Sequence, residues 1–297
     1  DGLDTLDTDV TFRLRSLLYF QAAITELRSA GYAILEGILQ DTAAGTSLSE
    51  LLEFFVNRYS GPGCPRKATD PWKPIVNTSA TGRRESSGRF TVPRIQYCDE
   101  LETDHRPYAL RKLYVEAILG HIMDKLGLTG QDRSDLAARK LFFPKTGSRL
   151  LMTVEGCKRQ LPHLDYAELP PTTEPCAIRG DESYFVMASG ADPFVLVILP
   201  YTHAMMNCSG STAREISAKW PSRIVKIPPY SVIIARGDLV HAGAASEDDE
   251  ERHSGSREYK YKYNVRMHLY AMREGTKLLD DFRKNPKKYL RIKLGLF

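Results

Sequence analysis

Short apolar runs separated by turn residues fill the second half of the chain, and this pattern constrains the fold more than any other feature. Runs of this kind, rich in β-branched and aromatic residues and bounded by Gly, Pro, Asn or Asp, predict β-strands. We expect strands at residues 149–154, 183–188, 194–199, 223–227, 231–235, 239–244 and 261–272. Many short strands in one block predict a β-sandwich or a small barrel.

The first half is predicted to be mainly helical. Helices are expected where apolar residues recur with the helical period, at residues 10–30, 47–61 and 107–127. Ser47 and Glu50 have the spacing of a capping box, which would start the second helix. Residues 32–39 are expected to form a strand, and the Gly- and Pro-rich residues 61–93 a long surface loop. A last helix is expected near residues 277–284, before a basic C-terminal stretch.

Composition narrows the class of partner and compartment. The 297 residues include 41 basic and 37 acidic side chains, and the net charge of +4 is too small to imply nucleic acid or an anionic membrane by itself. Five cysteines without a C-x-x-C pair favour a reducing compartment. No stretch approaches the roughly 18 apolar residues that a membrane span needs. We therefore expect an intracellular protein, cytoplasmic or nuclear, without a membrane span, and its oligomeric state is left open.

Candidate metal ligands occur at two places in the strand-rich half. His163 and Asp165 form an H-x-D triplet, and two residues that are two apart in an extended backbone point to the same side. His241, near the end of another apolar run, can supply a third ligand. Two histidines and one carboxylate on one face of an octahedron are typical of non-haem iron(II) oxygenases, whereas a structural zinc site would close the open positions. We therefore expect iron(II) at His163, Asp165 and His241, as the catalytic centre.

Residues 264–270 alternate polar and apolar side chains. If the apolar set packs outward against helices, Arg266, His268 and Tyr270 project into the barrel interior. A buried guanidinium needs an anion, and its planar fork suits a carboxylate. The dicarboxylate 2-oxoglutarate meets both demands, because its 2-oxo acid end can chelate iron while its distal carboxylate binds Arg266.

Together these motifs resemble the iron(II)/2-oxoglutarate-dependent dioxygenases, especially the phytanoyl-CoA hydroxylase-like branch. The resemblance covers most of the chain and is carried by residues 30–39, 163–165, 200–203, 241–243 and 264–266. Two departures stand out. The gap between His241 and Arg266 is longer than is usual, which we attribute to an inserted loop at residues 246–258, and Tyr201 and Thr202 replace Gly and Ser in the family's Pro-Gly-Ser-His turn.

The resemblance implies a mainly β or α+β fold of the cupin type, a double-stranded β-helix (jelly roll) braced by N-terminal helices. We expect one domain over residues 1–297, with helical support at 1–137, the jelly-roll core at 138–275, and a helix and basic tail at 276–297. The implied reaction oxidises a C–H bond of an organic substrate with O2 while 2-oxoglutarate becomes succinate and carbon dioxide, and ascorbate would act as a supporting reductant.

The remaining assignments concern the cosubstrate and the substrate. Arg266 is expected to bind the distal carboxylate of 2-oxoglutarate with the help of a hydroxyl group, from Thr153 or Tyr270. Three further side chains are candidates for contact with the substrate: Tyr166, Gln160 and His268. Each is equally consistent with a structural role.

The motifs do not name the substrate, and three functions stay open. The first is a hydroxylase of a small molecule or an acyl-type substrate, which the modest net charge favours. The second is an oxidase or demethylase of a modified nucleic-acid base, which would use the basic residues near Arg83, Arg84 and Arg89 and the basic C-terminus for phosphate contacts. The third is a non-catalytic jelly-roll binding domain.

Overall fold

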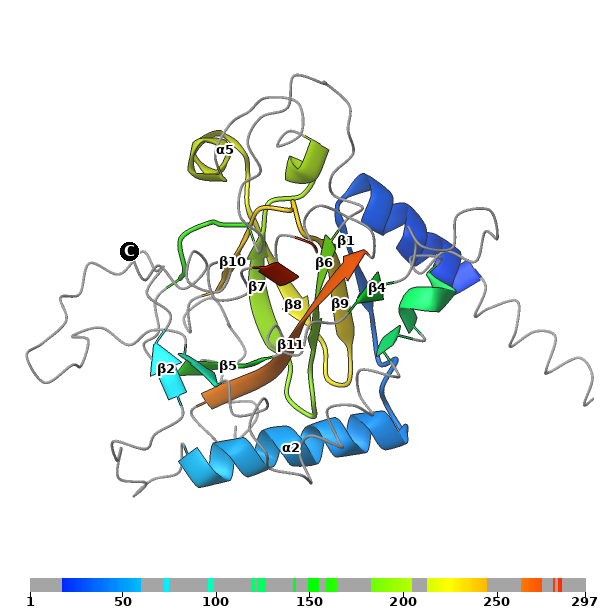
Figure 1. Ribbon diagram of the computed structural model, residues 1–297, viewed down its shortest axis with the longest axis vertical. Helices are drawn as coiled ribbons and strands as arrows, with labels where there is room; N and C mark the ends of the chain where they lie inside the picture. The colour runs from blue at the N-terminus through cyan, green and yellow to red at the C-terminus, as the bar shows by residue number, and fades with distance from the viewer. Residues whose placement is uncertain are drawn as a thin grey trace, which may run out of the picture.

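Two antiparallel β-sheets form the centre of the protein in this computed structural model (Figure 1). The structure describes residues 18–59, 72–74, 96–98, 119–120, 122–126, 141–142, 149–154, 159–164, 183–204, 213–244, 263–273, 280 and 283–284. The larger sheet contains β1 (Tyr32–Leu35), β2 (Trp72–Pro74), β3 (Gln96–Cys98), β4 (Leu141–Phe142), β5 (Arg149–Val154), β6 (Ser183–Ala188), β9 (Val232–Arg236) and β11 (Tyr263–Arg273). The smaller sheet contains β7 (Phe194–Ile198), β8 (Arg223–Ile227) and β10 (His241–Gly243).

The order of the strands identifies the fold. The larger sheet has the order β1-β9-β6-β11-β5-β3-β2, with β4 paired to β11, and the smaller sheet has the order β10-β7-β8. From β5 onward the chain moves between the sheets: residues 159–164 join β10 through a bridge between His163 and His241, β6 lies in the larger sheet, and β7 and β8 lie in the smaller one. β9 then returns to the larger sheet, β10 to the smaller and β11 to the larger. This alternation is that of a double-stranded β-helix, so the predicted fold class is confirmed.

Alternate residues of β11 face two different layers. The apolar set belongs to a buried cluster that includes residues of the N-terminal helices: Val265, Met267, Leu269 and Ala271. Tyr270 belongs to a second cluster, which joins the larger sheet to residues of β7 and β8. Arg266 and His268 share the side of Tyr270 and are buried. The predicted alternation is therefore confirmed, since the polar set lies between the sheets and the apolar set packs against helices.

The helix α2 (Ala43–Tyr59) packs beside the larger sheet (Figure 1). It begins four residues before Ser47, so the predicted capping box with Ser47 as the cap is wrong. Thr42 caps the helix instead, because its hydroxyl accepts a hydrogen bond from the N–H of Gly45 at 3.0 Å. Such a cap is worth about 1 kcal/mol, and burial of Leu48 adds about 2 kcal/mol.

The core strands were predicted within two residues at either end, whereas several peripheral elements were not predicted. Four elements have no counterpart in the prediction: the helix α5 (Ala213–Lys219) and the short strands β2, β3 and β4. Of these, β2 lies in the segment that was expected to be a loop. The first strand ends at Leu35, not at residue 39, because the chain turns at residues 36–40, where Gly37 has φ +61°. The other predicted helices are helical in the structure at residues 18–29, 119–120, 122–125, 280 and 283–284. Within the described residues, no helix has the length and apolar character needed to cross a membrane.

Candidate metal centre

The two histidines predicted as metal ligands are direct neighbours across two antiparallel segments. The N–H of His163 donates to the carbonyl oxygen of His241 at 2.9 Å, and the N–H of His241 donates to that of His163 at 3.1 Å. Residues that exchange both hydrogen bonds in this way project their side chains from one face. Their ring centroids are 4.7 Å apart and the ring planes are inclined by 50°. The fold thus brings the two predicted histidines together.

Each imidazole is oriented by the same local contact. His163 Nδ1 lies 2.7 Å from the carbonyl oxygen of Leu161, and His241 Nδ1 lies 3.1 Å from that of Leu239. Because a carbonyl oxygen can only accept, Nδ1 carries the proton in both rings, and the neutral ring then has an unprotonated Nε2. This is the form that binds a metal, and a backbone carbonyl is a usual orienting partner for a metal-binding histidine. The chemistry of the donor pair therefore fits a metal such as iron(II).

The predicted third ligand, Asp165, and the predicted substrate contact, Tyr166, lie outside the described residues. In the part of the chain that the structure describes, no three His, Cys, Asp or Glu side chains come together as a metal site. Asp165 follows His163 by two positions, and its role as third ligand stays a prediction.

An aromatic side chain that the sequence analysis did not single out packs against the histidine pair. Phe185 on β6 is fully buried, and its ring centroid lies 4.3 Å from that of His241 and 6.0 Å from that of His268. His268 in turn meets Tyr270 edge-on, with centroids 4.4 Å apart. A row of rings, from His163 through His241, Phe185 and His268 to Tyr270, therefore crosses the space between the sheets. Phe185 could have been found only through its pairing with Tyr270 across β6 and β11, which the sequence does not reveal.

Arg266 is fully buried on the face of β11 that lies between the two sheets, two residues before His268. Its Nη1 donates a hydrogen bond to the Thr153 hydroxyl at 2.9 Å, and its guanidinium carbon lies 5.3 Å from the centre of the Phe194 ring. Thr153 is therefore the predicted helper that reaches Arg266. Tyr270 is four residues along the strand, or about 13 Å at about 3.3 Å per residue, and its aromatic contact is with His268. The structure brings Thr153 to Arg266 and places Tyr270 in the row of rings.

Gln160 is engaged with the strand that carries His241. Its backbone N–H donates to the carbonyl oxygen of Gly243 at 3.0 Å, and its side-chain oxygen accepts from the N–H of Gly243 at 2.7 Å. The side chain is buried. The side-chain oxygen of Gln160 therefore serves β10, and its predicted contact with the substrate stays a prediction.

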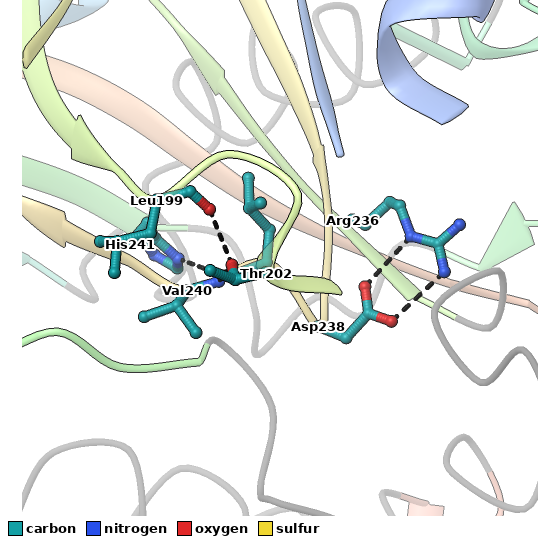
Figure 2. Close-up of polar contacts among 7 residues, drawn as sticks. Leu199, Thr202, Arg236, Asp238, Val240 and His241 are labelled. Atoms are coloured by element: carbon teal, nitrogen blue, oxygen red, sulfur yellow. Dashed lines mark hydrogen bonds and ion pairs between the residues drawn. The ribbon is translucent and has the colours of Figure 1, made fainter. Parts of the chain in front are cut away.

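The turn at residues 200–203 supports the same strand from the other side. Figure 2 shows the Thr202 hydroxyl between the carbonyl oxygen of Leu199, to which it donates at 2.7 Å, and the N–H of Val240, from which it accepts at 3.0 Å. Val240 immediately precedes His241. In the sequence this turn is only a point of resemblance to the family, and no sequence signal indicates a role for Thr202.

His203, in the same turn, is buried against the end of the first helix. A Cβ atom placed on Gly31 would lie 2.5 Å from His203 Nδ1, so this position needs glycine, and the φ of +89° at Gly31 needs it as well. The N–H of Tyr201 donates to the carbonyl oxygen of Ala30 at 3.0 Å. His203 thus helps to join the turn to the N-terminal helix.

A partly buried ion pair precedes β10 on the chain. Arg236 Nε and Nη2 donate to the two carboxylate oxygens of Asp238 at 3.1 and 3.3 Å (Figure 2). The N–H of Leu239 donates to the carbonyl oxygen of Arg236 at 3.1 Å and closes the turn. Because Leu239 supplies the carbonyl group that orients His241, this turn also contributes to the ligand's geometry.

Comparison with known proteins places the fold. Neither the protein-family models nor the curated proteins match this sequence. Among solved structures, AviO1 from Streptomyces viridochromogenes Tue57 superposes with a TM-score of 0.54 at 14% identity, over 86% of this chain and 96% of AviO1. SnoN, a non-heme α-ketoglutarate-dependent epimerase from nogalamycin biosynthesis, has a TM-score of 0.51 at 15% identity, over 88% of this chain and 89% of SnoN. EvdMO1 has a TM-score of 0.53 at 14% identity, over 86% of this chain and 50% of EvdMO1.

This chain has the double-stranded β-helix fold of the iron- and 2-oxoglutarate-dependent oxygenases. At this level of identity the likeness concerns the fold. The function rests on the site, and the phytanoyl-CoA hydroxylase-like branch stays a prediction.

Proposed function

We propose that this protein is an iron(II)- and 2-oxoglutarate-dependent oxygenase that oxidises a C–H bond of a small organic molecule. The observation that carries the proposal is the pair His163 and His241, in which both Nδ1 atoms face backbone carbonyl groups, so that each neutral ring would present the lone pair of its Nε2 to a metal. The fold supports the proposal, because SnoN is described as α-ketoglutarate-dependent.

The residues divide into three roles. His163, Asp165 and His241 would hold iron(II), which when bound supplies the reactivity toward O2 and C–H bonds. Arg266, oriented by the Thr153 hydroxyl, would bind the distal carboxylate of 2-oxoglutarate through its guanidinium fork. Phe185 and its apolar neighbours between the sheets exclude water from the side of His241 that faces the larger sheet.

A small molecule or an acyl-type compound is the substrate class that we favour. SnoN, which has the same fold, belongs to the biosynthesis of a small molecule, nogalamycin. The net charge of +4 provides no strong attraction for polyphosphate chains. The reaction outcome, hydroxylation or another result of C–H oxidation, would depend on how the substrate lies relative to the metal.

The test is turnover of 2-oxoglutarate by the purified protein with iron(II), O2 and ascorbate, measured as succinate formed. Wild type should form succinate even without its own substrate, and His163→Ala and His241→Ala should lose this activity and bind iron(II) weakly. Lys226→Ala, a change of an exposed residue on β8, is the control and should behave as wild type. Absence of both iron(II) binding and succinate formation in the wild type would refute the proposal.

A further inference from the structure

β10 is only three residues long, yet it carries His241. A regular antiparallel pair exchanges two backbone hydrogen bonds at each hydrogen-bonded rung. The rung between His163 and His241 is complete, since both N–H groups donate to the opposite carbonyl oxygen. Two other rungs of β10, one toward β7 and one toward residues 159–164, are not regular, and both departures involve a buried polar side chain.

The first departure lies between β10 and the end of β7. The N–H of Leu199 donates to the carbonyl oxygen of Val240 at 3.0 Å, as a ladder requires. The return hydrogen bond, from the N–H of Val240 to the carbonyl oxygen of Leu199, is replaced by a bridge. Thr202 Oγ1 accepts from Val240 at 3.0 Å and donates to Leu199 at 2.7 Å, so one fully buried hydroxyl group completes the rung (Figure 2).

The second departure lies between β10 and residues 159–164. The N–H of Gln160 donates to the carbonyl oxygen of Gly243, but the N–H of Gly243 donates to Oε1 of Gln160 and not to its backbone oxygen. The next rung joins His163 to His241. Between the two rungs, one strand advances by three residues, from Gln160 to His163, whereas the other advances by only two, between Gly243 and His241. One extra residue is thus accommodated, as in a β-bulge, with Pro162, which has no N–H group, in the interval. The bulge leaves the carbonyl oxygen of Leu161 facing Nδ1 of His163.

We infer that Thr202 and Gln160 are positioning residues that fix the backbone of His241 from its two sides and so set the direction in which its Nε2 points. The inference deepens the proposed function and rests on it, because it assigns these side chains to the same metal centre. Neither residue would touch the metal. Both act through the amide groups of Val240 and Gly243, which flank His241 and the residue after it.

The expected loss of metal affinity follows from what holds for metal sites in general. Loss of an interaction that orients a metal-binding histidine typically costs about 10- to 100-fold in metal affinity. Thr202→Val has nearly the same shape as threonine but cannot bridge Val240 and Leu199. Thr202→Ser keeps the hydroxyl group. We expect Thr202→Val to weaken the affinity for cobalt(II), the spectroscopic probe for the iron site, by about 10- to 100-fold and to change the visible absorption of the bound cobalt, and Thr202→Ser to restore both.

The second pair of variants tests the other side of β10. Gln160→Met removes the acceptor for the N–H of Gly243 at similar volume, whereas Gln160→Glu keeps an acceptor at that place. Gln160→Met should weaken cobalt(II) binding in the same range as Thr202→Val, and Gln160→Glu should not. If one variant fails to fold, as judged by circular dichroism, the other pair tests the inference by itself.

Hydrogen exchange in the metal-free protein separates this inference from the proposed function. The amide of Val240 should exchange faster in Thr202→Val, and that of Gly243 faster in Gln160→Met, while the control Lys226→Ala changes neither. Faster exchange together with wild-type cobalt(II) affinity and spectrum would overturn the positioning role. A wild type that binds no metal would refute the proposed function instead, whatever the exchange rates show.

Discussion

The ring of Phe185 lies against the imidazole of His241, with ring centroids 4.3 Å apart and ring planes inclined by 34°. Phe185 comes from the larger sheet and His241 from the smaller one, so this contact ties the candidate metal centre to the core between the sheets. His163, the other member of the histidine pair, is half-buried, with its ring centroid 4.7 Å from that of His241. The histidine pair is therefore packed against the core through the contact of His241 with Phe185.

Phe185→Ala should destabilise the protein and loosen His241 at the same time. A buried phenylalanine replaced by alanine typically costs about 3–5 kcal/mol of unfolding free energy. The expected results are a lower urea midpoint and a weaker affinity for cobalt(II). Ile224→Ala is the control, because Ile224 is 54% exposed on β8 and should change the unfolding free energy by less than about 0.5 kcal/mol. Unchanged metal affinity in folded Phe185→Ala would show that the ring does not orient His241.

Arg266→Lys should weaken 2-oxoglutarate binding and leave metal binding intact. Lysine keeps the charge but lacks the planar fork that pairs with a carboxylate, and a hydrogen bond to a charged group is worth about 1.5–3 kcal/mol. At about 1.4 kcal/mol per factor of ten, the KM for 2-oxoglutarate should rise by about 10- to 100-fold. The same exchange at the exposed Arg223, on β8, is the matched control. An unchanged KM would remove Arg266 from the cosubstrate site.

Thr153→Val tests how far the guanidinium depends on its hydroxyl partner. The variant loses the 2.9 Å hydrogen bond from Arg266 Nη1 but keeps the volume of the side chain. Because Thr153 orients the guanidinium and does not itself bind the cosubstrate, only part of the roughly 1.5–3 kcal/mol of this charge-assisted hydrogen bond should reach cosubstrate binding, so the KM for 2-oxoglutarate should rise by about 2- to 10-fold, less than in Arg266→Lys. Thr153→Ser should lie close to wild type. A KM in Thr153→Val as high as in Arg266→Lys would indicate that Thr153 itself binds the cosubstrate.

The sequence predicted the strands that carry the site because those strands have clear alternation or long apolar runs. On β11, the alternating pattern placed Arg266 between the sheets, and the structure confirms that placement. The pairing of His163 with His241 could not be read from local pattern, because the two residues meet only when the smaller sheet forms. The chemistry of a shared ligand set and the resemblance to a family, and not periodicity, connected them.

The supporting residues were harder to predict for a physical reason. Thr202 and Gln160 act by replacing single hydrogen bonds of a ladder, and such replacements depend on the register of two segments. In the sequence, Phe185 cannot be distinguished from the other apolar residues of its strand, because its contact with His241 depends on how the two sheets pack. The predicted start of α2 was wrong because Ser47 and Glu50 match the capping-box pattern although they lie inside the helix, whose N-terminal cap is Thr42.

Gly31→Ala should destabilise the junction between the first helix and β1. Gly31 has φ +89°, where alanine is strained, and an added Cβ would lie 2.5 Å from His203 Nδ1 and 2.9 Å from Leu239 Cδ1. Strain of this kind costs about 1–3 kcal/mol, which thermal unfolding would detect. Because Leu239 orients His241, cobalt(II) affinity should fall as well. A melting temperature equal to that of the wild type would contradict the close packing of His203 on this glycine.

Tyr201→Gly tests the backbone strain of the turn at residues 200–203. Tyr201 adopts φ +67°, a left-handed conformation that costs an L-residue about 1–2 kcal/mol, and glycine has no such penalty but loses about 0.5–1 kcal/mol of chain entropy on folding. Tyr201 is 47% exposed, so either variant also loses the contacts of the buried half of the tyrosine. Tyr201→Ala is therefore the control, because it loses the ring as well but keeps the backbone strain. We expect Tyr201→Gly to exceed Tyr201→Ala by up to about 1 kcal/mol in unfolding free energy, with wild-type metal affinity in both, whereas the reverse order would show that the left-handed backbone does not destabilise this turn.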